Sequence, residues 1–178
     1  MSYVDQLKYL RALNWNTLED PMDLMVWNRA NTNFWLPERI ALSDDKPAWR
    51  SFTDEERDVT MKVFVGLTLL DTIQSEIGVC NLKKHAQTAQ EPHVLNQFEY
   101  MESVHTRTYS SIFMTLASTA LITQAFNWSY ENQFLQKKGR LIEEAYKSGD
   151  PLKVKVASVF LESFVFYSGF YWPLYWLT

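Results

Sequence analysis

The sequence predicts an all-α protein, because stretches with helical periodicity follow one another and few residues interrupt them. Of the 178 residues, 47% are hydrophobic and 15% aromatic, whereas only 5 are glycine and 6 are proline. This composition favours long helices over a sheet with many turns. No run of alternating apolar and polar residues predicts a strand. The length suits one core, so we expect residues 1–178 to form a single domain.

The N-terminal part, residues 1–50, is expected to be an irregular segment of short helices and loops. It is rich in tryptophan, and one short helix is expected around residues 23–32. Turn signals stand at Asp20-Pro21, Leu36-Pro37 and Lys46-Pro47.

Residues 53–178 are expected to form long helices whose starts are marked by capping residues. Thr53 and Glu56 make a capping box at the first of them. The last opens with Asp150 as its cap and Pro151 in its first turn. The expected helices span residues 53–84, 92–118, 130–147 and 150–170, the last extending to residue 170 or later.

Charge and cysteine content exclude several functions. The net charge is −4 and basic residues form no cluster, so binding of nucleic acid through a cationic face is not expected. The single cysteine, Cys80, permits neither an internal disulfide nor a zinc site of paired cysteines. The first residues lack the pattern of a signal peptide, and a cytoplasmic location is expected.

One segment, residues 156–178, is apolar and long enough to raise the question of a membrane span. The alternative is a helix buried inside a helical protein. Its only charge, Glu162, lies well inside the segment, and serines and Pro173 interrupt it. These features favour burial, so no membrane is expected as a partner.

Three of the expected helices carry an acidic residue in the middle of an apolar stripe. The stripes are Phe64, Leu67, Asp71, Gln74 and Gly78; then Phe98, Glu102, His105, Tyr109, Ile112 and Leu116; and finally Val159, Glu162, Phe166 and Phe170. An isolated buried carboxylate costs several kcal/mol or becomes protonated. Because no lysine or arginine shares these stripes, a common metal cation is the natural partner of the acids.

The donor types favour iron or manganese, which accept carboxylates and imidazole. Glu102 and His105 form Glu-x-x-His, a spacing that points both side chains at one spot. Taken singly, each residue has a simpler explanation. Glu-x-x-His occurs by chance in many helices, His105 alone is typical of a hydrogen-bonded core histidine, and Asp71 alone of an acid bonded to a nearby tryptophan. Only the joint pattern favours a metal site.

Four segments together resemble the small subunit of class Ib ribonucleotide reductase, from about Leu13 to the last residues. They read NWNTLEDPMDLMVWNRANTNFWLPERIALSDDKPAW, VFVGLTLLDTIQSEIG, YMESVHTRTYSSIF and KVASVFLESFVFYSGF. The resemblance implies a ferritin-like helical bundle that is incomplete here, because only the N-terminal half of the family's chain is matched and the later helices are lacking.

The resemblance also implies roles for particular residues. Asp71, Glu102, His105 and Glu162 match the metal ligands of the family. Tyr109 matches the tyrosine that carries the stable radical.

Three further aromatic residues acquire roles in the same way. Trp35 matches the tryptophan that begins the electron-transfer path to the surface, and Phe166 and Phe170 fit the apolar pocket that shields the radical.

Cofactor and partners follow from the resemblance as well. Family members use a di-manganese or di-iron centre, and a flavodoxin-like protein activates the manganese form. The large subunit binds the ribonucleoside diphosphate and reduces it with the radical that the small subunit supplies. Small subunits pair as homodimers.

The family's chain is about twice as long, and its second half supplies a further glutamate and a second histidine ligand. We therefore expect this chain to be inactive alone. It is interpreted as one part of a split subunit or as a fragment, with self-pairing in another role as the alternative. Two rival functions stay open: another di-metal carboxylate oxidase, and a non-catalytic fragment that acts only as a binding or assembly partner.

Overall fold

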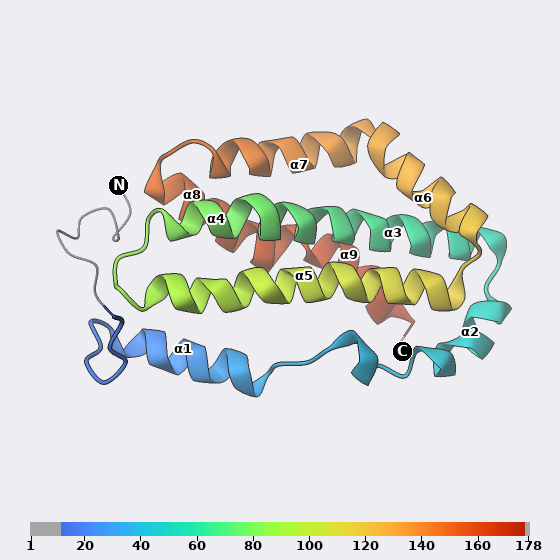
Figure 1. The fold of residues 1–178 in the computed structure, drawn as a ribbon. Helices are drawn as coiled ribbons and strands as arrows, with labels where there is room; N and C mark the ends of the chain where they lie inside the picture. Colours follow the sequence, from blue (N-terminus) through green and yellow to red (C-terminus); the bar gives the residue numbers. More distant parts are fainter. Residues whose placement is uncertain (1–11, 177–178) are drawn as a thin grey trace.

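The computed structural model describes residues 12–176, and every regular element in that range is helical (Figure 1). The predicted all-α class is therefore confirmed. The long helices lie roughly parallel or antiparallel to one another and form a bundle, with α1 and α2 along one side (Figure 1).

The N-terminal region consists of short helical pieces, as the sequence predicts. They are α1 (Pro21–Thr32), the 3₁₀ turns Pro37–Arg39 and Leu42–Asp45, and α2 (Lys46–Ser51). Each of the three X-Pro dipeptides starts one of these pieces, because proline lacks an N–H and its fixed φ suits a first helical turn. At α1, the Asp20 side chain caps the helix by accepting from the Met22 N–H.

The first long helix comprises α3 (Asp54–Ile73), a π-helical turn (Gln74–Gly78) and α4 (Val79–Lys83). Its predicted start is confirmed, since the Thr53 hydroxyl accepts from the Glu56 N–H and the Glu56 carboxylate accepts from the Thr53 N–H. In the π turn the Val79 N–H donates to the Gln74 carbonyl, which widens the helix by one residue.

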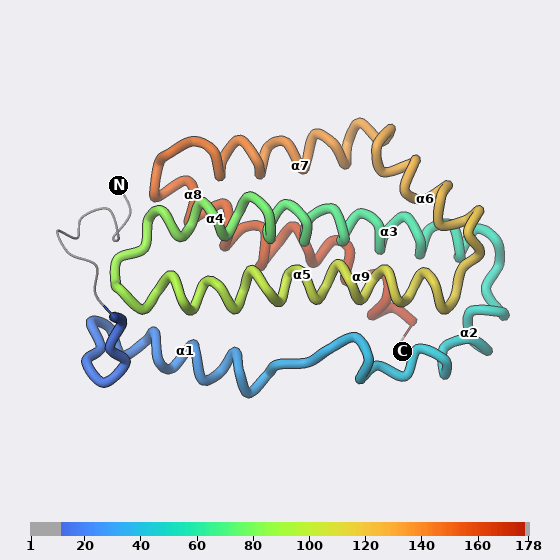
Figure 2. Tube along the Cα trace, viewed as in Figure 1, coloured from blue at the N-terminus to red at the C-terminus, as the bar shows by residue number. Residues whose placement is uncertain are grey.

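The second long helix, α5 (Glu91–Leu116), runs antiparallel to α3 and α4 along their length (Figure 2). Beyond it, the predicted helix over residues 130–147 is confirmed as α7 (Gln133–Tyr146), which starts three residues later than expected. The helix before it, α6 (Thr119–Glu131), was not predicted, and the two helices meet at Asn132. Asn132 adopts an extended backbone and its side chain caps α7, so it ends one helix and starts the next.

The last helical stretch comprises α8 (Pro151–Phe160), a π-helical turn (Leu161–Val165) and α9 (Tyr167–Tyr175). It begins at the predicted cap, where the Asp150 carboxylate accepts from two backbone N–H groups. Figures 1 and 2 show this stretch crossing behind α3 and α4, antiparallel to α7.

Two contacts hold α9 against α3. Gly169 lies so close to Leu67 that a β-carbon at Gly169 would stand 2.5 Å from Leu67 Cδ2. Trp172 Nε1 donates a hydrogen bond of 2.8 Å to Thr60 Oγ1. Both contacts place the aromatic residues of α9 over the middle of α3.

Two of the predicted buried faces are partly wrong. Phe98 on α5 is 40% exposed and Val159 on α8 is 66% exposed. Val159 departs from the predicted stripe because the buried face of this helix is formed by Val154, Ala157, Leu161 and Val165, which follow one another at spacings of three, four and four.

Among the described residues, the helix Asp54–Lys83 is long and apolar enough to cross a membrane, judged by length and composition alone. Core helices of soluble bundles meet the same criterion. Buried Asp71 lies in the middle of this helix.

Candidate metal centre

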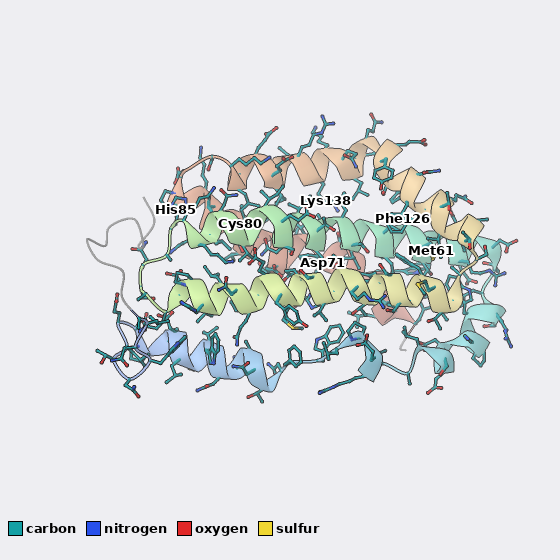
Figure 3. All side chains as sticks on the ribbon, in the orientation of Figure 1. Met61, Asp71, Cys80, His85, Phe126 and Lys138 are labelled. Atoms are coloured by element: carbon teal, nitrogen blue, oxygen red, sulfur yellow. The ribbon has the colours of Figure 1, made fainter. Side chains whose placement is uncertain are left out.

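The centre of the bundle holds a cluster of two carboxylates and one imidazole. Asp71 comes from α3, and Glu102 and His105 come from consecutive turns of α5. One potential ligand atom from each residue lies within 4.8 Å of the other two. Figure 3 places Asp71 midway along the bundle, between α3 and α5. The prediction that these three side chains converge is borne out geometrically.

The imidazole of His105 links the two acids. Its Nδ1 lies 3.3 Å from Glu102 Oε2 and 3.7 Å from Asp71 Oδ1. Asp71 is 4% exposed and Glu102 is 8% exposed, so neither carboxylate is well hydrated. A buried ionised acid is stable only beside a compensating positive charge.

The pKa values of the cluster reflect this shortage of positive charge. Burial raises the pKa of both Asp71 and Glu102, and the imidazole of His105 opposes that rise. Burial by itself lowers the pKa of His105, but hydrogen bonds and charge from the two acids outweigh it and raise the pKa to about 10. Without a metal ion, the cluster therefore keeps a proton on His105 as its cation.

Glu162 lies next to this cluster but differs from the prediction in its burial. Expected on a buried face, it is exposed as a residue, because the buried face of the π turn is formed by its neighbours Leu161 and Val165. Nearby protein nevertheless removes water from its carboxyl group. That desolvation, followed by the charge of Glu102, raises its pKa to about 7.

The three acids of the site interact electrostatically. The charge of Glu102 raises the pKa of Glu162, and the charge of Asp71 raises the pKa of Glu102. The charge of Glu162 also raises the pKa of Asp71, so the three carboxyl groups lie within electrostatic reach of one another.

Two residues beside Glu162 had no role in the sequence interpretation. The Gln74 amide donates to Glu162 Oε1 at 2.8 Å, and Tyr146 Oη donates to Gln74 Oε1 at 2.5 Å. Gln74 was on a predicted apolar stripe without a partner. Tyr146 ends the buried stripe of α7, so its burial was readable from the sequence, but its partner was not.

Tyr109 lies one turn beyond His105 on α5 and inside an apolar cluster. Its ring centroid is 5.6 Å from that of Phe64, and it packs against the buried core that includes Phe166. Burial raises the pKa of the Tyr109 phenol, and the charges of Asp71 and Glu102 raise it further. The phenol therefore stays protonated in this environment.

Phe166 and Phe170 belong to the same cluster as Tyr109. Their rings are stacked, with centroids 5.8 Å apart and an interplanar angle of 8°. Phe166 is 3% exposed, and Phe170 is partly buried against the cluster. The structure thus brings both residues into the apolar surroundings of the tyrosine.

Trp35 reaches the cluster from the segment that follows α1. Its indole stacks on the His105 imidazole, with centroids 5.7 Å apart and an interplanar angle of 23°. The extended backbone at Leu36 and the 3₁₀ turn that starts at buried Pro37 position the indole there.

The donor set fits a divalent cation. Two buried carboxylates and an imidazole converge within a few ångströms, with no lysine or arginine among the residues that shift their pKa values. Oxygen donors with imidazole suit iron or manganese, whereas thiolate sites suit zinc.

The family described as "Ribonucleotide reductase, small chain" matches residues 12–178. The chain belongs to the ribonucleotide reductase small-chain family. The chain spans about half the length of the curated relatives that it matches. It covers 53% of the ribonucleoside-diphosphate reductase 2 subunit beta of Escherichia coli, with 52% identity over 170 residues that make up 96% of this chain.

Other ribonucleotide reductase small chains give the same result. The beta subunit of Mycobacterium leprae is 51% identical over 99% of this chain, which covers 53% of that protein. The crystal structure of the dimanganese(II) NrdF of Streptococcus sanguinis is 50% identical and superposes with a TM-score of 0.93, over 95% of this chain and 60% of that one. The R2 subunit of Clostridium botulinum is 26% identical, with a TM-score of 0.83 over 92% of this chain and 53% of that one.

These likenesses confirm the resemblance to the N-terminal half of a class Ib small subunit, and they confirm the ferritin-like bundle of that family. The metal-binding, radical and electron-transfer roles of individual residues in this chain remain predictions.

Proposed function

We propose that this chain is the first half of the radical-generating small subunit of a class Ib ribonucleoside-diphosphate reductase. In that role it forms one domain and contributes Asp71, Glu102, His105 and Glu162 to a di-manganese or di-iron centre. The observation that carries the proposal is the convergence of Asp71, Glu102 and His105 at the middle of a bundle of this family. Such a centre, when bound, supplies the oxidising power that converts a tyrosine into a radical.

The four proposed ligands would hold the two ions together. Ligand atoms of Asp71, Glu102 and His105 lie within 4.8 Å of one another, and the carboxyl group of Glu162 interacts electrostatically with both acids. Their carboxylate oxygens and the imidazole nitrogen would bind the ions. Before an ion enters, His105 holds the proton that the ion replaces.

Tyr109 is the proposed site of the radical. It lies one helical turn from His105, and its burial among Phe64, Phe166 and Phe170 supports this role. These aromatic rings exclude water and solutes from the phenol, and a radical persists only where such molecules cannot reach it.

Trp35 is the proposed first carrier of the electron between the centre and the surface. The stack on His105 supports this role, since it brings an oxidisable ring into contact with a ligand. The large subunit, which binds the ribonucleotide, would be the acceptor of the radical.

We further propose that residues other than these 178 complete the site. They belong either to a longer form of the same polypeptide or to a separate polypeptide. Two observations support this: the relatives are about twice as long, and large apolar side chains of α8 and α9 are exposed. The exposed side chains are Leu152, Val156, Val159, Phe160, Phe164, Tyr167, Tyr171, Leu174 and Tyr175. A homodimer of complete sites, a flavodoxin-like activating partner and a cytoplasmic location belong to the same proposal.

Metal binding provides the direct test. Mn(II) titrated into the chain should lose its free-ion EPR signal, and Glu102→Gln should weaken binding by at least about tenfold, because it removes one of the two buried carboxylates that converge with His105. Glu76→Gln, which changes an exposed acid on the same helix as Asp71, is the matched control and should bind like the wild type. Equal Mn(II) affinity in all three proteins would contradict the proposal.

The radical distinguishes a reductase subunit from the rival oxidase. With a polypeptide that supplies the second half, the activated wild type should show a tyrosyl EPR signal and support ribonucleotide reduction. Tyr109→Phe should lose both while retaining the bound metal. If instead Tyr109→Phe keeps its full oxygen-consuming activity and the wild type forms no radical, the protein is a di-metal oxidase.

A further inference from the structure

A one-directional chain of hydrogen bonds ends on Glu162. Tyr146 Oη donates to Gln74 Oε1 at 2.5 Å, and Gln74 Nε2 donates to Glu162 Oε1 at 2.8 Å. Gln74 Nε2 also lies 3.3 Å from Ser158 Oγ. These hydrogen bonds therefore link the end of α7, the π turn after α3 and the π turn after α8.

The chemistry of the three groups fixes the direction of this chain. When Glu162 is ionised, as it would be when it binds a metal ion, its carboxylate only accepts hydrogen bonds, so Gln74 must present its NH₂ group to Glu162. Its carbonyl then faces Tyr146, whose hydroxyl must donate. Turning the amide over would set the carbonyl against the carboxylate, and Tyr146 would lose its acceptor. Tyr146 therefore holds the Gln74 amide in the one orientation that serves Glu162.

Burial stabilises the hydrogen bonds between Tyr146, Gln74 and Glu162. Tyr146 is 0% exposed and Gln74 is 4% exposed, so water cannot replace either bond readily. A buried polar group that loses its partner destabilises the fold, because no water molecule takes the partner's place.

The backbone at Gly78 leaves the space that the side chains of Gln74 and Tyr146 occupy. A β-carbon at Gly78 would collide with Gln74 Oε1 and stand 2.9 Å from two ring atoms of Tyr146. Glycine at this position is thus what lets the phenol reach the amide. Gln74 and Glu162 both stand in π turns, a rare conformation that is frequent at functional sites.

We infer that Gln74 and Tyr146 are positioning residues for Glu162. They occupy one oxygen of its carboxylate and so aim the other at a metal ion. This inference rests on the proposed function, because it takes Glu162 as a ligand. The alternative is that the buried Tyr146 hydroxyl only stabilises the fold.

The test uses the full chain, Mn(II) and Tyr146→Phe, which removes only the hydroxyl. We expect the affinity for Mn(II) to fall about 2–13-fold, the loss that one hydrogen bond of about 0.5–1.5 kcal/mol produces, and the EPR line shape of the bound ion to change. Tyr130→Phe, at an exposed tyrosine, is the matched control and should leave both unchanged. Gly78→Ala disturbs the same amide through the backbone and should reproduce the effect.

A double-mutant cycle separates positioning from stability. If Tyr146 acts through Glu162, then adding Tyr146→Phe to Glu162→Gln should cause no further loss of Mn(II) affinity. A lower melting temperature with unchanged Mn(II) affinity and line shape in both Tyr146→Phe and Gly78→Ala overturns the inference and leaves the proposed function standing. Absence of Mn(II) binding by the wild type overturns the proposed function, and the inference with it.

Discussion

Replacing Gly169 with alanine tests how closely α9 must approach α3. The new β-carbon would stand 2.5 Å from Leu67 Cδ2, 2.9 Å from Cγ and 3.3 Å from Cδ1. Leu67 is 3% exposed and belongs to the buried core that Tyr109 packs against, so it has little space into which it can turn. Either the leucine leaves its rotamer or α9 moves outward.

The magnitude follows from two opposing effects. Overpacking of this kind costs about 1–3 kcal/mol, whereas alanine in a helix is favoured over glycine by about 0.5–1 kcal/mol. The net loss in the free energy of unfolding should be about 0.5–2 kcal/mol. For a chain of this length, that lowers the melting temperature by about 1–8 °C.

Gly66→Ala is the matched control for this prediction. Gly66 also lies in a long helix, but its added β-carbon would meet only Leu135 Cδ1 at the ordinary contact distance of 3.8 Å. This variant should therefore raise the melting temperature. Thermal unfolding followed by circular dichroism measures both. If Gly169→Ala stabilises the protein as much as Gly66→Ala does, the close approach of the two helices is refuted.

Two further predictions concern the metal centre. Affinity for Mn(II) should rise between pH 6 and pH 8 by about tenfold or more per unit, because the ion displaces the proton of His105, whose pKa is about 10, and below about pH 7 also that of Glu162. An affinity that does not vary with pH, measured by titration at fixed ionic strength, would show that neither proton competes with the ion. Trp35→Leu removes the ring that stacks on His105 and should abolish ribonucleotide reduction by the assembled enzyme while the tyrosyl radical still forms. Loss of the radical in Trp35→Leu would instead mean that the indole holds the ligand in place.

Local signals in the sequence predicted much of the fold correctly. The capping box at Thr53 and the Asp150-Pro151 start are interactions within one turn of helix, so they can be read without tertiary information. The predicted helix over residues 130–147 corresponds to α7, but α6 was missed although its signal is equally local. Ser118 caps α6 and Asn132 caps α7.

The acidic residues that meet in the candidate site were also visible in the sequence. Asp71, Glu102 and His105 interrupt apolar stripes, and the cost of burying such groups pointed to a shared cation. The spacing of three between Glu102 and His105 placed them on one face, as the structure has them.

Only the tertiary structure decided how Glu162 is held. Its burial was mispredicted because this apolar helix offers two faces at helical spacing, and packing buries the one with Val154, Ala157, Leu161 and Val165 instead of the one with Val159 and Glu162. Its link to Gln74 and Tyr146 joins residues 88 and 72 positions apart in the sequence. A sequence read alone reveals which residues are costly to bury, since that cost belongs to each side chain. It does not reveal which distant group relieves the cost, since that depends on how the helices pack.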